Sequence, residues 1–247
     1  MENQIYLSVV IPAYNEENRL PKTLEEIDKY LRKQSYTYEI IVISDGSKDR
    51  TADVVRGLMP KIQNLKLINN KDNHGKGYVV RQGLLEAKGK YRLFTDADNS
   101  TSVDQVEKMW PWLEKEFDIV IGSRDLPESV LAVSQPWLRK IILGGGFKLF
   151  RKFIIGLWEI SDTQCGFKCF TNKSAEYILP KCKIDRFAFD PEILVVGKLS
   201  GYKIKEIPVT WINDLESKVK FKSIIKMAFD LIKIRLNLIK GIYGKKE

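Results

Sequence analysis

Residues 91–102 read Tyr-Arg-Leu-Phe-Thr-Asp-Ala-Asp-Asn-Ser-Thr-Ser, and the rest of the fold can be inferred around them. A short run with apolar Leu93 and Phe94 leads to two carboxylates, Asp96 and Asp98. Side chains two positions apart in an extended segment point to the same face, and two acids placed in that way repel each other. A hard divalent cation, Mg²⁺ or Mn²⁺, relieves such repulsion and often shares its oxygen ligands with a substrate phosphate. The stretch therefore predicts a metal site at a strand end, with a solvated acidic turn as the alternative.

Other apolar runs predict the strands that surround this one. They cover residues 7–12, 39–44, 65–69, 117–122 and 204–212. Short continuous apolar runs are typical of strands that are buried on both faces of a parallel sheet. Helical spacing of apolar residues follows the first three runs. This alternation predicts an α/β fold, with a mainly parallel sheet and helices on both of its faces.

Polar loops follow several of the predicted strands. In parallel sheets ligands bind beyond the carboxyl ends of the strands, where we expect residues 13–17, 45–51 and 96–102. The segment 73–77, Asn-His-Gly-Lys-Gly, precedes a predicted helix. Its glycines allow close backbone approach, the helix amino terminus favours an anion, and Lys76 adds a positive charge. These features predict a site for a nucleoside diphosphate, and the lack of a Walker A or Gly-x-Gly-x-x-Gly pattern argues against a P-loop ATPase or a dehydrogenase.

Charge is distributed unevenly along the 247 residues, which carry a net charge of +9. Nine basic and three acidic residues lie between Leu215 and Glu247. A basic tail indicates an anionic partner, which could be nucleic acid, an anionic membrane surface or a phosphorylated ligand, unless it is simply a solvated face. We predict one α/β domain over residues 1–215, and a basic amphipathic segment over residues 216–247 that packs on the domain or on a membrane surface.

Two segments combine apolar residues with cations. Residues 136–160 hold five cations and one acid among Ile, Leu, Phe and Trp, and residues 223–243 begin with an amphipathic helix. Long basic side chains among apolar ones suit the boundary between water and lipid, but a helix packed on the domain with solvated lysines explains them equally well.

Cysteine usage and hydropathy bear on the compartment. Cys165, Cys169 and Cys182 form no even set, and a single histidine, His74, completes no zinc spacing, so we expect reduced and buried thiols. No signal peptide is visible after Met1, and no apolar run reaches the roughly 18 residues of a spanning helix. We therefore expect a cytoplasmic protein that associates peripherally with the cytoplasmic face of a membrane.

With these residues in view, the chain resembles a family-2 glycosyltransferase of the GT-A, Rossmann-like fold. Within that family it is most similar to the branch of dolichyl-phosphate β-glucosyltransferases and polyprenyl-phosphate glycosyltransferases. The motifs that carry the resemblance recur in the family's order over nearly the whole chain, at residues 10–16, 45–51, 73–77 with Arg81, 96–98, 122–124, 162–168, 186–190 and 217–218. The motif at residues 162–168, Asp-Thr-Gln-Cys-Gly-Phe-Lys, is the most specific to the prenyl-phosphate branch.

The resemblance implies a role for each matched residue. The residues implied to bind the nucleotide are Pro12, Ala13, Tyr14, Glu16, Asp45, Lys76, Asp96, Ser217 and Lys218. Those implied to act in catalysis are Asp98, Arg124, Asp162 and Gln164, with Asp96 and Asp98 holding Mg²⁺ or Mn²⁺, and Arg124 and Arg139 receiving the acceptor phosphate. Two features depart from the family: Ser44 stands where many relatives have an acid, and no counterpart of the amino-terminal anchor of the eukaryotic enzymes is seen in these residues, so we expect membrane attachment to rest on the basic apolar segments.

The implied reaction is inverting transfer of a hexose, most simply glucose from the nucleotide-sugar donor UDP-glucose, to a polyprenyl or dolichyl phosphate. Such an acceptor is already charged near neutral pH and needs no dedicated base. A saccharide acceptor is the first alternative and requires a carboxylate base, for which Asp162, Asp190 and Glu192 are available. The second alternative is a non-catalytic, basic RNA-binding module. The acids at the strand ends argue against it, so we expect no nucleic acid as a partner.

Overall fold

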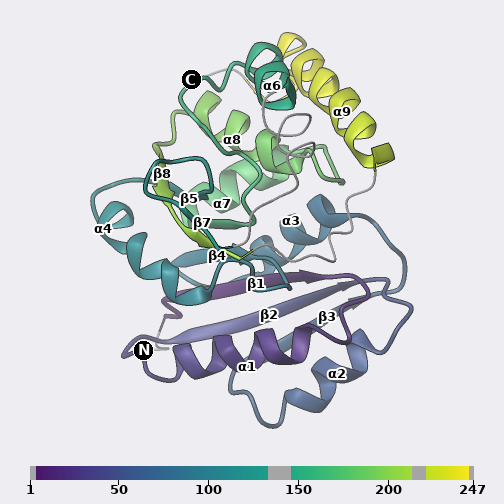
Figure 1. Ribbon diagram of the computed structural model, residues 1–247, viewed down its shortest axis with the longest axis vertical. Helices are drawn as coiled ribbons and strands as arrows, with labels where there is room; N and C mark the ends of the chain where they lie inside the picture. Colours follow the sequence, from purple (N-terminus) through teal and green to yellow (C-terminus); the bar gives the residue numbers. More distant parts are fainter. Residues whose placement is uncertain (1–3, 133–145, 213–220, 245–247) are drawn as a thin grey trace.

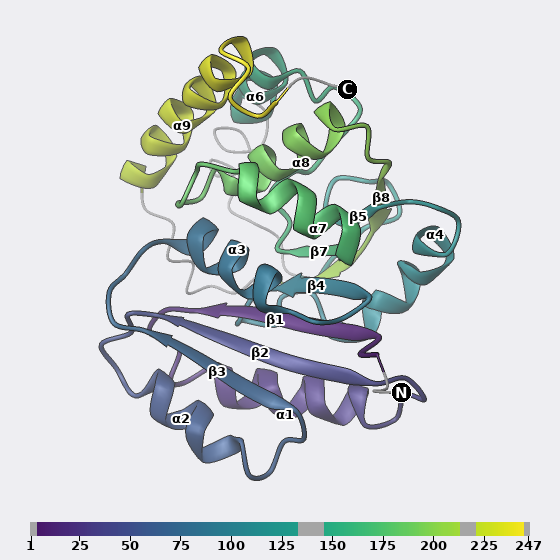
Figure 2. The same cartoon turned by 180° about the vertical axis from the view of Figure 1, so that it is seen from behind.

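A twisted seven-stranded sheet forms the centre of the molecule, and helices cover both of its faces (Figures 1 and 2). The computed structural model describes residues 4–132, 146–212 and 221–244. The strand order is β3-β2-β1-β4-β7-β5-β8. The strands are β1 (Leu7–Ala13), β2 (Tyr38–Asp45), β3 (Leu65–Asn70), β4 (Tyr91–Thr95), β5 (Ile119–Ser123), β7 (Phe167–Thr171) and β8 (Ile204–Pro208).

The sheet is parallel except at β7, which pairs antiparallel with β4 on one side and with β5 on the other. The predicted class, a mainly parallel sheet with helices on both faces, is confirmed. The sequence did not predict a strand at β7, where only a polar turn leading into an apolar run was visible. A separate two-stranded sheet pairs β6 (Val130–Leu131) with β9 (Thr210–Trp211).

Two layers of helices enclose the sheet. One face is covered by α1 (Leu20–Leu31), α2 (Thr51–Leu58), the 3₁₀ helix η1 (Val103–Lys108) and α4 (Trp110–Leu113). The other face is covered by α3 (Lys76–Glu86), α7 (Asn172–Ile178), the 3₁₀ turn η3 (Leu179–Lys181) and α8 (Phe189–Leu199), with α6 (Phe147–Ile155) and α9 (Phe221–Ile239) outside them. Alternate residues of β1 contribute to opposite cores, since Val9 lies in the α1 layer and Val10 in the α3 layer.

Helix α9 packs on the domain through one narrow face. Met227, Leu231 and Ile234 are buried in the same core as α8. Asn237 is buried too, and its amide donates to the hydroxyl of Tyr243. The predicted boundary between residues 215 and 216 lies outside the described residues. Within the described ranges, no helix combines the length and the apolar character needed to cross a membrane.

The three cysteines are buried free thiols, as predicted. Burial raises the pKa of Cys165 to about 12 and also raises the pKa of Cys169, so both thiols stay protonated near neutral pH. They act as small apolar groups in the core.

Candidate active site

The carboxyl ends of β1 and β2 carry two loops that hydrogen-bond to each other. The backbone N–H of Asn15 donates to Oγ of Ser47 at 3.1 Å, and Oδ1 of Asn15 accepts from the N–H of Lys48 at 2.8 Å. The N–H of Glu16 donates to Oγ1 of Thr51 at 2.8 Å. The residues predicted to line the nucleoside pocket are therefore held at one sheet edge: Pro12, Ala13 and Glu16 are buried, and Tyr14 is exposed.

Asp45, at the end of β2, holds the segment that precedes α3. Its carboxylate accepts hydrogen bonds from the backbone N–H groups of His74 and Gly75, both at 2.8 Å, and from Nδ2 of Asn73 at 2.9 Å. Gly75 has a positive φ of 109°, and a Cβ there would lie 2.4 Å from the carbonyl oxygen of Asp185. Only glycine fits this turn without strain. Asp45, which the resemblance implies binds the nucleotide, thus also shapes the loop in front of Lys76.

Lys76 begins α3 and reaches the aspartates at the end of β4. Its Nζ lies 2.6 Å from Oδ1 of Asp96. Burial alone would lower the pKa of Lys76, but the carboxylates of Asp96 and Asp190 outweigh that effect and raise it. The lysine therefore stays charged beside the predicted metal ligands.

Asp96 and Asp98 lie together in the turn after β4. Burial, and next the charge of Asp96, raise the pKa of Asp98. Oδ1 of Asp98 accepts from the N–H of Ser100 at 3.0 Å, which leaves further lone pairs available. Within the part of the chain that the structure describes, no group of three or more metal-ligating side chains is present. Two crowded carboxylates still fit a hard divalent cation that takes its other oxygens from a diphosphate or water, because such a cation would remove the repulsion.

Gly166 makes the position of Asp96 possible. The backbone N–H of Asp96 donates to the carbonyl oxygen of Gly166 at 3.2 Å. A Cβ at residue 166 would lie 1.9 Å from Oδ2 of Asp96. A glycine just before β7 therefore lets the carboxylate lie directly against the chain, and this contact was not predicted.

A buried ion pair lies behind these groups. Nζ of Lys168, the second residue of β7, lies 2.5 Å from Oδ1 of Asp190 and also donates to the carbonyl oxygen of Cys165. Both side chains are buried, and burial raises the pKa of Asp190 in spite of the lysine. Sequence reasoning assigned no role to Lys168. A lysine inside an otherwise apolar strand was the available signal, because an unpaired lysine is almost never fully buried.

Arg124, Asp162 and Gln164 are brought together at the end of β5. Nε of Arg124 lies 2.6 Å from Oδ2 of Asp162, and Nη2 lies 3.0 Å from Oδ1. Oδ1 also accepts from the N–H of Gln164 at 2.9 Å. Glu206 on β8 accepts from the N–H of Asp162 at 2.7 Å and so fixes the turn. Of the other predicted site residues, Arg139, Ser217 and Lys218 lie outside the described residues.

The comparison with protein families bears directly on this arrangement. Residues 8–175 match the family model described as glycosyl transferase family 2. The chain belongs to that family. The matched range contains Asp45, Lys76, Asp96, Asp98, Arg124, Asp162 and Gln164. The resemblance stated from the motifs is therefore confirmed.

Curated relatives of this glycosyltransferase match nearly its whole length. The chain is 41% identical over 258 residues to a dolichyl-phosphate beta-glucosyltransferase of Dictyostelium discoideum, covering 99% of this chain and 78% of that protein. It is 35% identical over 256 residues to the human protein of the same name, covering 98% of this chain and 78% of the relative.

Solved structures show the same fold. A mannosyltransferase from Pyrobaculum calidifontis, in complex with GDP-Man and Mn²⁺, aligns with a TM-score of 0.64 at 20% identity, covering 98% of this chain and 65% of that one. The UDP complex of glucosyl-3-phosphoglycerate synthase from Mycobacterium tuberculosis aligns with a TM-score of 0.66 at 14% identity, covering 98% and 82%. At these identities the likeness supports the GT-A fold of this glycosyltransferase.

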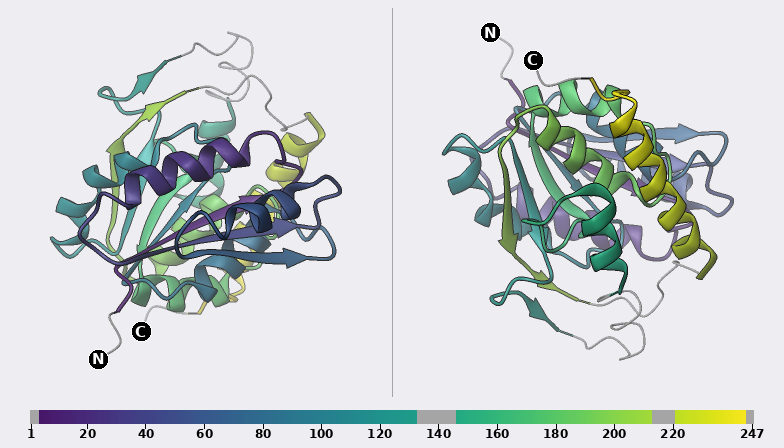
Figure 3. Two further views of the ribbon diagram at one scale, coloured as in Figure 1. Left: turned by 90° about the horizontal axis from the view of Figure 1, so that it is seen from below. Right: turned by 90° about the horizontal axis from the view of Figure 1, so that it is seen from above.

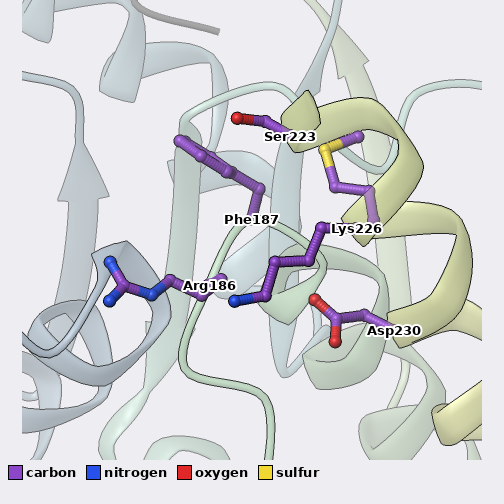
Figure 4. A pocket seen from close by; sticks show the side chains of 6 residues that line it. Arg186, Phe187, Ser223, Lys226 and Asp230 are labelled. Carbon is purple, nitrogen blue, oxygen red and sulfur yellow. The ribbon is translucent and has the colours of Figure 1, made fainter. Parts of the chain in front are cut away.

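A small cavity of about 210 Å³ opens beside the site of the glycosyltransferase. Figure 4 shows Arg186 and Phe187 on a loop opposite Ser223, Lys226 and Asp230 of α9. Met227 also lines the cavity. Nη1 of Arg186 lies 2.6 Å from Oδ1 of Asn73, and Nε2 of Gln164 lies 3.9 Å from Sδ of Met227. The cavity therefore adjoins both the loop before α3 and the turn that carries Gln164. The motif at residues 186–190 had been noted, but a cavity formed with α9 could not be foreseen.

Proposed function

We propose that this glycosyltransferase moves glucose from UDP-glucose to dolichyl phosphate or another polyprenyl phosphate, with inversion at the anomeric carbon. The observation that carries the proposal is the group of Lys76, Asp96 and Asp98 at the sheet edge, beside the amino terminus of α3. It provides the charges that a nucleotide-sugar diphosphate requires. The choice of glucose and of a prenyl-phosphate acceptor is supported by the names of relatives that match 98–99% of the chain.

The donor site would be formed by both carboxylates and the lysine. Asp96 and Asp98 would hold Mg²⁺ or Mn²⁺, which supplies Lewis-acid stabilisation of the departing diphosphate. Lys76 adds a second positive charge in the same place, and its pKa stays high because Asp96 and Asp190 face it. Asp45 keeps the loop before Lys76 in position through His74 and Gly75.

The acceptor needs orientation more than activation. A phosphate monoester has its second pKa at about 6, so it is largely dianionic near neutral pH. One of its oxygens would bond to the anomeric carbon while the bond from that carbon to the UDP oxygen breaks, and UDP leaves with the electron pair. Arg124 would attract the acceptor phosphate, and its ion pair with Asp162 fixes the direction of the guanidinium group.

The candidate base carboxylates already have hydrogen-bond or ion-pair partners, which favours a phosphate acceptor over a saccharide acceptor. Each carboxylate that could act as the base has partners already: Asp162 pairs with Arg124, and Asp190 pairs with Lys168. Glu192 accepts from the N–H groups of Lys183 and Ile184 and from the hydroxyl of Tyr243. A base that must remove a proton from a sugar hydroxyl needs a free lone pair aimed at that hydroxyl. The arrangement therefore supports an acceptor that carries its own negative charge.

The cavity next to Gln164 offers a path for this acceptor. Arg186 and Lys226 supply cations for a phosphate, and Phe187 and Met227 supply apolar surface for the first isoprene unit. We include it in the proposal as the acceptor's entrance.

One experiment tests the donor and the acceptor together. The purified chain is incubated with UDP-glucose, GDP-mannose or UDP-N-acetylglucosamine, with Mg²⁺ or Mn²⁺, and with a prenyl phosphate, the corresponding prenyl alcohol or free sugars. We expect a glucosylated prenyl phosphate, identified by mass, from UDP-glucose alone. Transfer to a free sugar without any transfer to the prenyl phosphate would overturn the proposal.

A further inference from the structure

Helix α9 has a second apolar face that the domain does not cover. Its buried residues Met227, Leu231 and Ile234 point toward the core. Five large apolar residues are 41–68% exposed: Ile225, Phe229, Ile232, Leu236 and Ile239. They recur at alternating steps of four and three, so at 3.6 residues per turn they form one straight line, which we call the outer stripe. The outer stripe lies nearly opposite the buried face, and a contiguous apolar surface of this kind marks an interaction site.

The helix next to α9 also carries exposed apolar side chains. Leu149 and Phe153 on α6, with Trp158 just after it, are 52–67% exposed. The rings of Phe153 and Trp158 contact each other edge to face, with centroids 5.0 Å apart. Helices α6 and α9 lie beside each other at the same end of the molecule (Figures 1 and 3). The outer stripe and these three residues therefore belong to one end of the protein.

Cations border this apolar surface. Lys226, Lys233 and Lys240 are exposed along one side of the outer stripe, and Arg235 is exposed on the other. Asp230 is the only acid in the sequence of α9. On α6, Lys152 is partly exposed, Lys148 pairs with Asp125, and Arg151 is buried, where it donates to the carbonyl oxygens of Ile160 and Ser161. An apolar stripe between exposed cations is the arrangement by which a helix lies in the surface of an anionic bilayer.

We propose that α9 and α6 form the face by which this protein rests on an anionic lipid bilayer. A second copy of the chain fits the same surface less well. Two-fold pairing through the outer stripe would bring the lysine-bearing borders of two α9 helices together, and α9 offers only Asp230 to compensate. The proposal rests on the surface itself and does not depend on which sugar or acceptor the active site takes.

The cavity beside Gln164 lies on the other side of α9 from the outer stripe. Ser223, Lys226 and Met227 line it from the first turns of α9, and Met227 belongs to the buried face of that helix. The cavity therefore faces the domain and not the proposed membrane surface.

Vesicle flotation of the full chain tests the proposal. Phosphatidylcholine vesicles are compared with vesicles that also contain phosphatidylserine, at low and high salt. The double variant Phe229→Gln/Leu236→Gln is compared with a matched control, Met59→Gln/Leu85→Gln, which alters exposed apolar residues just after α2 and on α3. We expect wild type and control to float with anionic vesicles, and the α9 variant to bind at least about tenfold more weakly. The variant Lys233→Gln/Lys240→Gln should lose about fivefold per lysine on anionic vesicles alone.

Three outcomes would overturn the proposal. The first is equal vesicle binding by the α9 variant and wild type, and the second is no vesicle binding by wild type. The third is a dimer in light scattering that becomes a monomer in the α9 variant, when neither form binds vesicles. A parallel assay separates this proposal from the function. On a short prenyl phosphate dissolved in detergent, the α9 variant should keep wild-type activity. If wild type floats with vesicles but transfers no sugar, the proposed function fails and the membrane face stands.

Discussion

Arg124 and Asp162, 38 residues apart in the sequence, meet through two parallel contacts of 2.6 and 3.0 Å. The carboxylate is buried and the guanidinium group is partly exposed, with its carbon 5.5 Å from the ring centroid of Trp211. This geometry fixes a permanent positive charge at the end of β5.

Arg124→Lys tests that orientation. Lysine keeps the charge but cannot make both contacts to Asp162, so we expect kcat/KM for prenyl phosphate to fall about 10- to 100-fold while the KM for UDP-glucose changes little. Steady-state kinetics with each substrate varied in turn gives the answer. Arg32→Lys, at the surface pair with Asp28, is the matched control and should behave like wild type. An equal loss in both variants would remove the assigned role.

Gly166→Ala should disable the site through a single methyl group. The added Cβ would lie 1.9 Å from Oδ2 of Asp96, so the carboxylate must move. We expect transfer activity to fall at least about tenfold and stability to fall by about 1–3 kcal/mol. Gly57→Ala is the control, because nothing lies within 4 Å of its Cβ and it sits in helix α2, where alanine should stabilise by about 0.5–1 kcal/mol. Urea unfolding and the transfer assay together check both values, and full activity in Gly166→Ala would contradict the contact.

The proposed binding of a metal ion by Asp98 can be measured apart from activity. Without a cation, Asp96 and Asp98 repel each other, so Asp98→Asn should leave the thermal midpoint unchanged or raise it slightly. Mn²⁺ with UDP should raise the midpoint of wild type and not that of the variant. Asp53→Asn, at an exposed pair on α2, is the control and should respond like wild type. The assignment fails if Asp98→Asn retains both the Mn²⁺-dependent shift and transfer.

Breaking the buried ion pair of Lys168 and Asp190 should strongly lower the free energy of unfolding. Lys168→Met leaves Asp190 as a buried charge without its partner, and we expect a loss of about 3–5 kcal/mol. The double variant Lys168→Met/Asp190→Leu should lose less than Lys168→Met alone, because neither charge remains. Urea unfolding of both single variants and of the double variant gives the coupling. Additive losses would show that the two groups act independently.

The buried carboxyl group of Glu39 should make the stability of the fold sensitive to acid. It is buried, and hydrogen bonds from Lys66, Ser8 and the N–H of Lys88 outweigh its burial and lower its pKa from 4.5. A carboxyl with a lowered folded-state pKa contributes stability above its unfolded value, and that contribution is lost as the pH falls through the folded value. Unfolding free energy should therefore drop below about pH 4.5. The drop should be smaller in Glu39→Gln, while Glu25→Gln, at an exposed position, should follow wild type; equal pH profiles for all three would refute it.

Much of the architecture is readable from local sequence. Apolar runs such as residues 7–12 and 39–44 became β1 and β2, and Leu20, Leu24, Ile27 and Leu31 became the buried face of α1. Strands β1 and β2 are buried along their whole length, and burial in α1 follows the 3.6-residue period, so these elements are encoded within a few neighbouring residues. The acids at positions 96 and 98 and the motifs of the family are equally local. Together they indicated the class, the family and the sheet edge that carries the site.

The contacts that shape the site are not local. Gly166 lies against Asp96, and Lys168 pairs with Asp190, because β7 inserts antiparallel between β4 and β5. Strand order depends on how the whole set of apolar faces packs, and no short window of sequence contains that information. The surroundings of α9 could not be read from a short window of sequence either, because its composition suits both packing on the domain and contact with lipid. Only the folded chain gave its two apolar faces different surroundings, since one could reach the core and the opposite one could not.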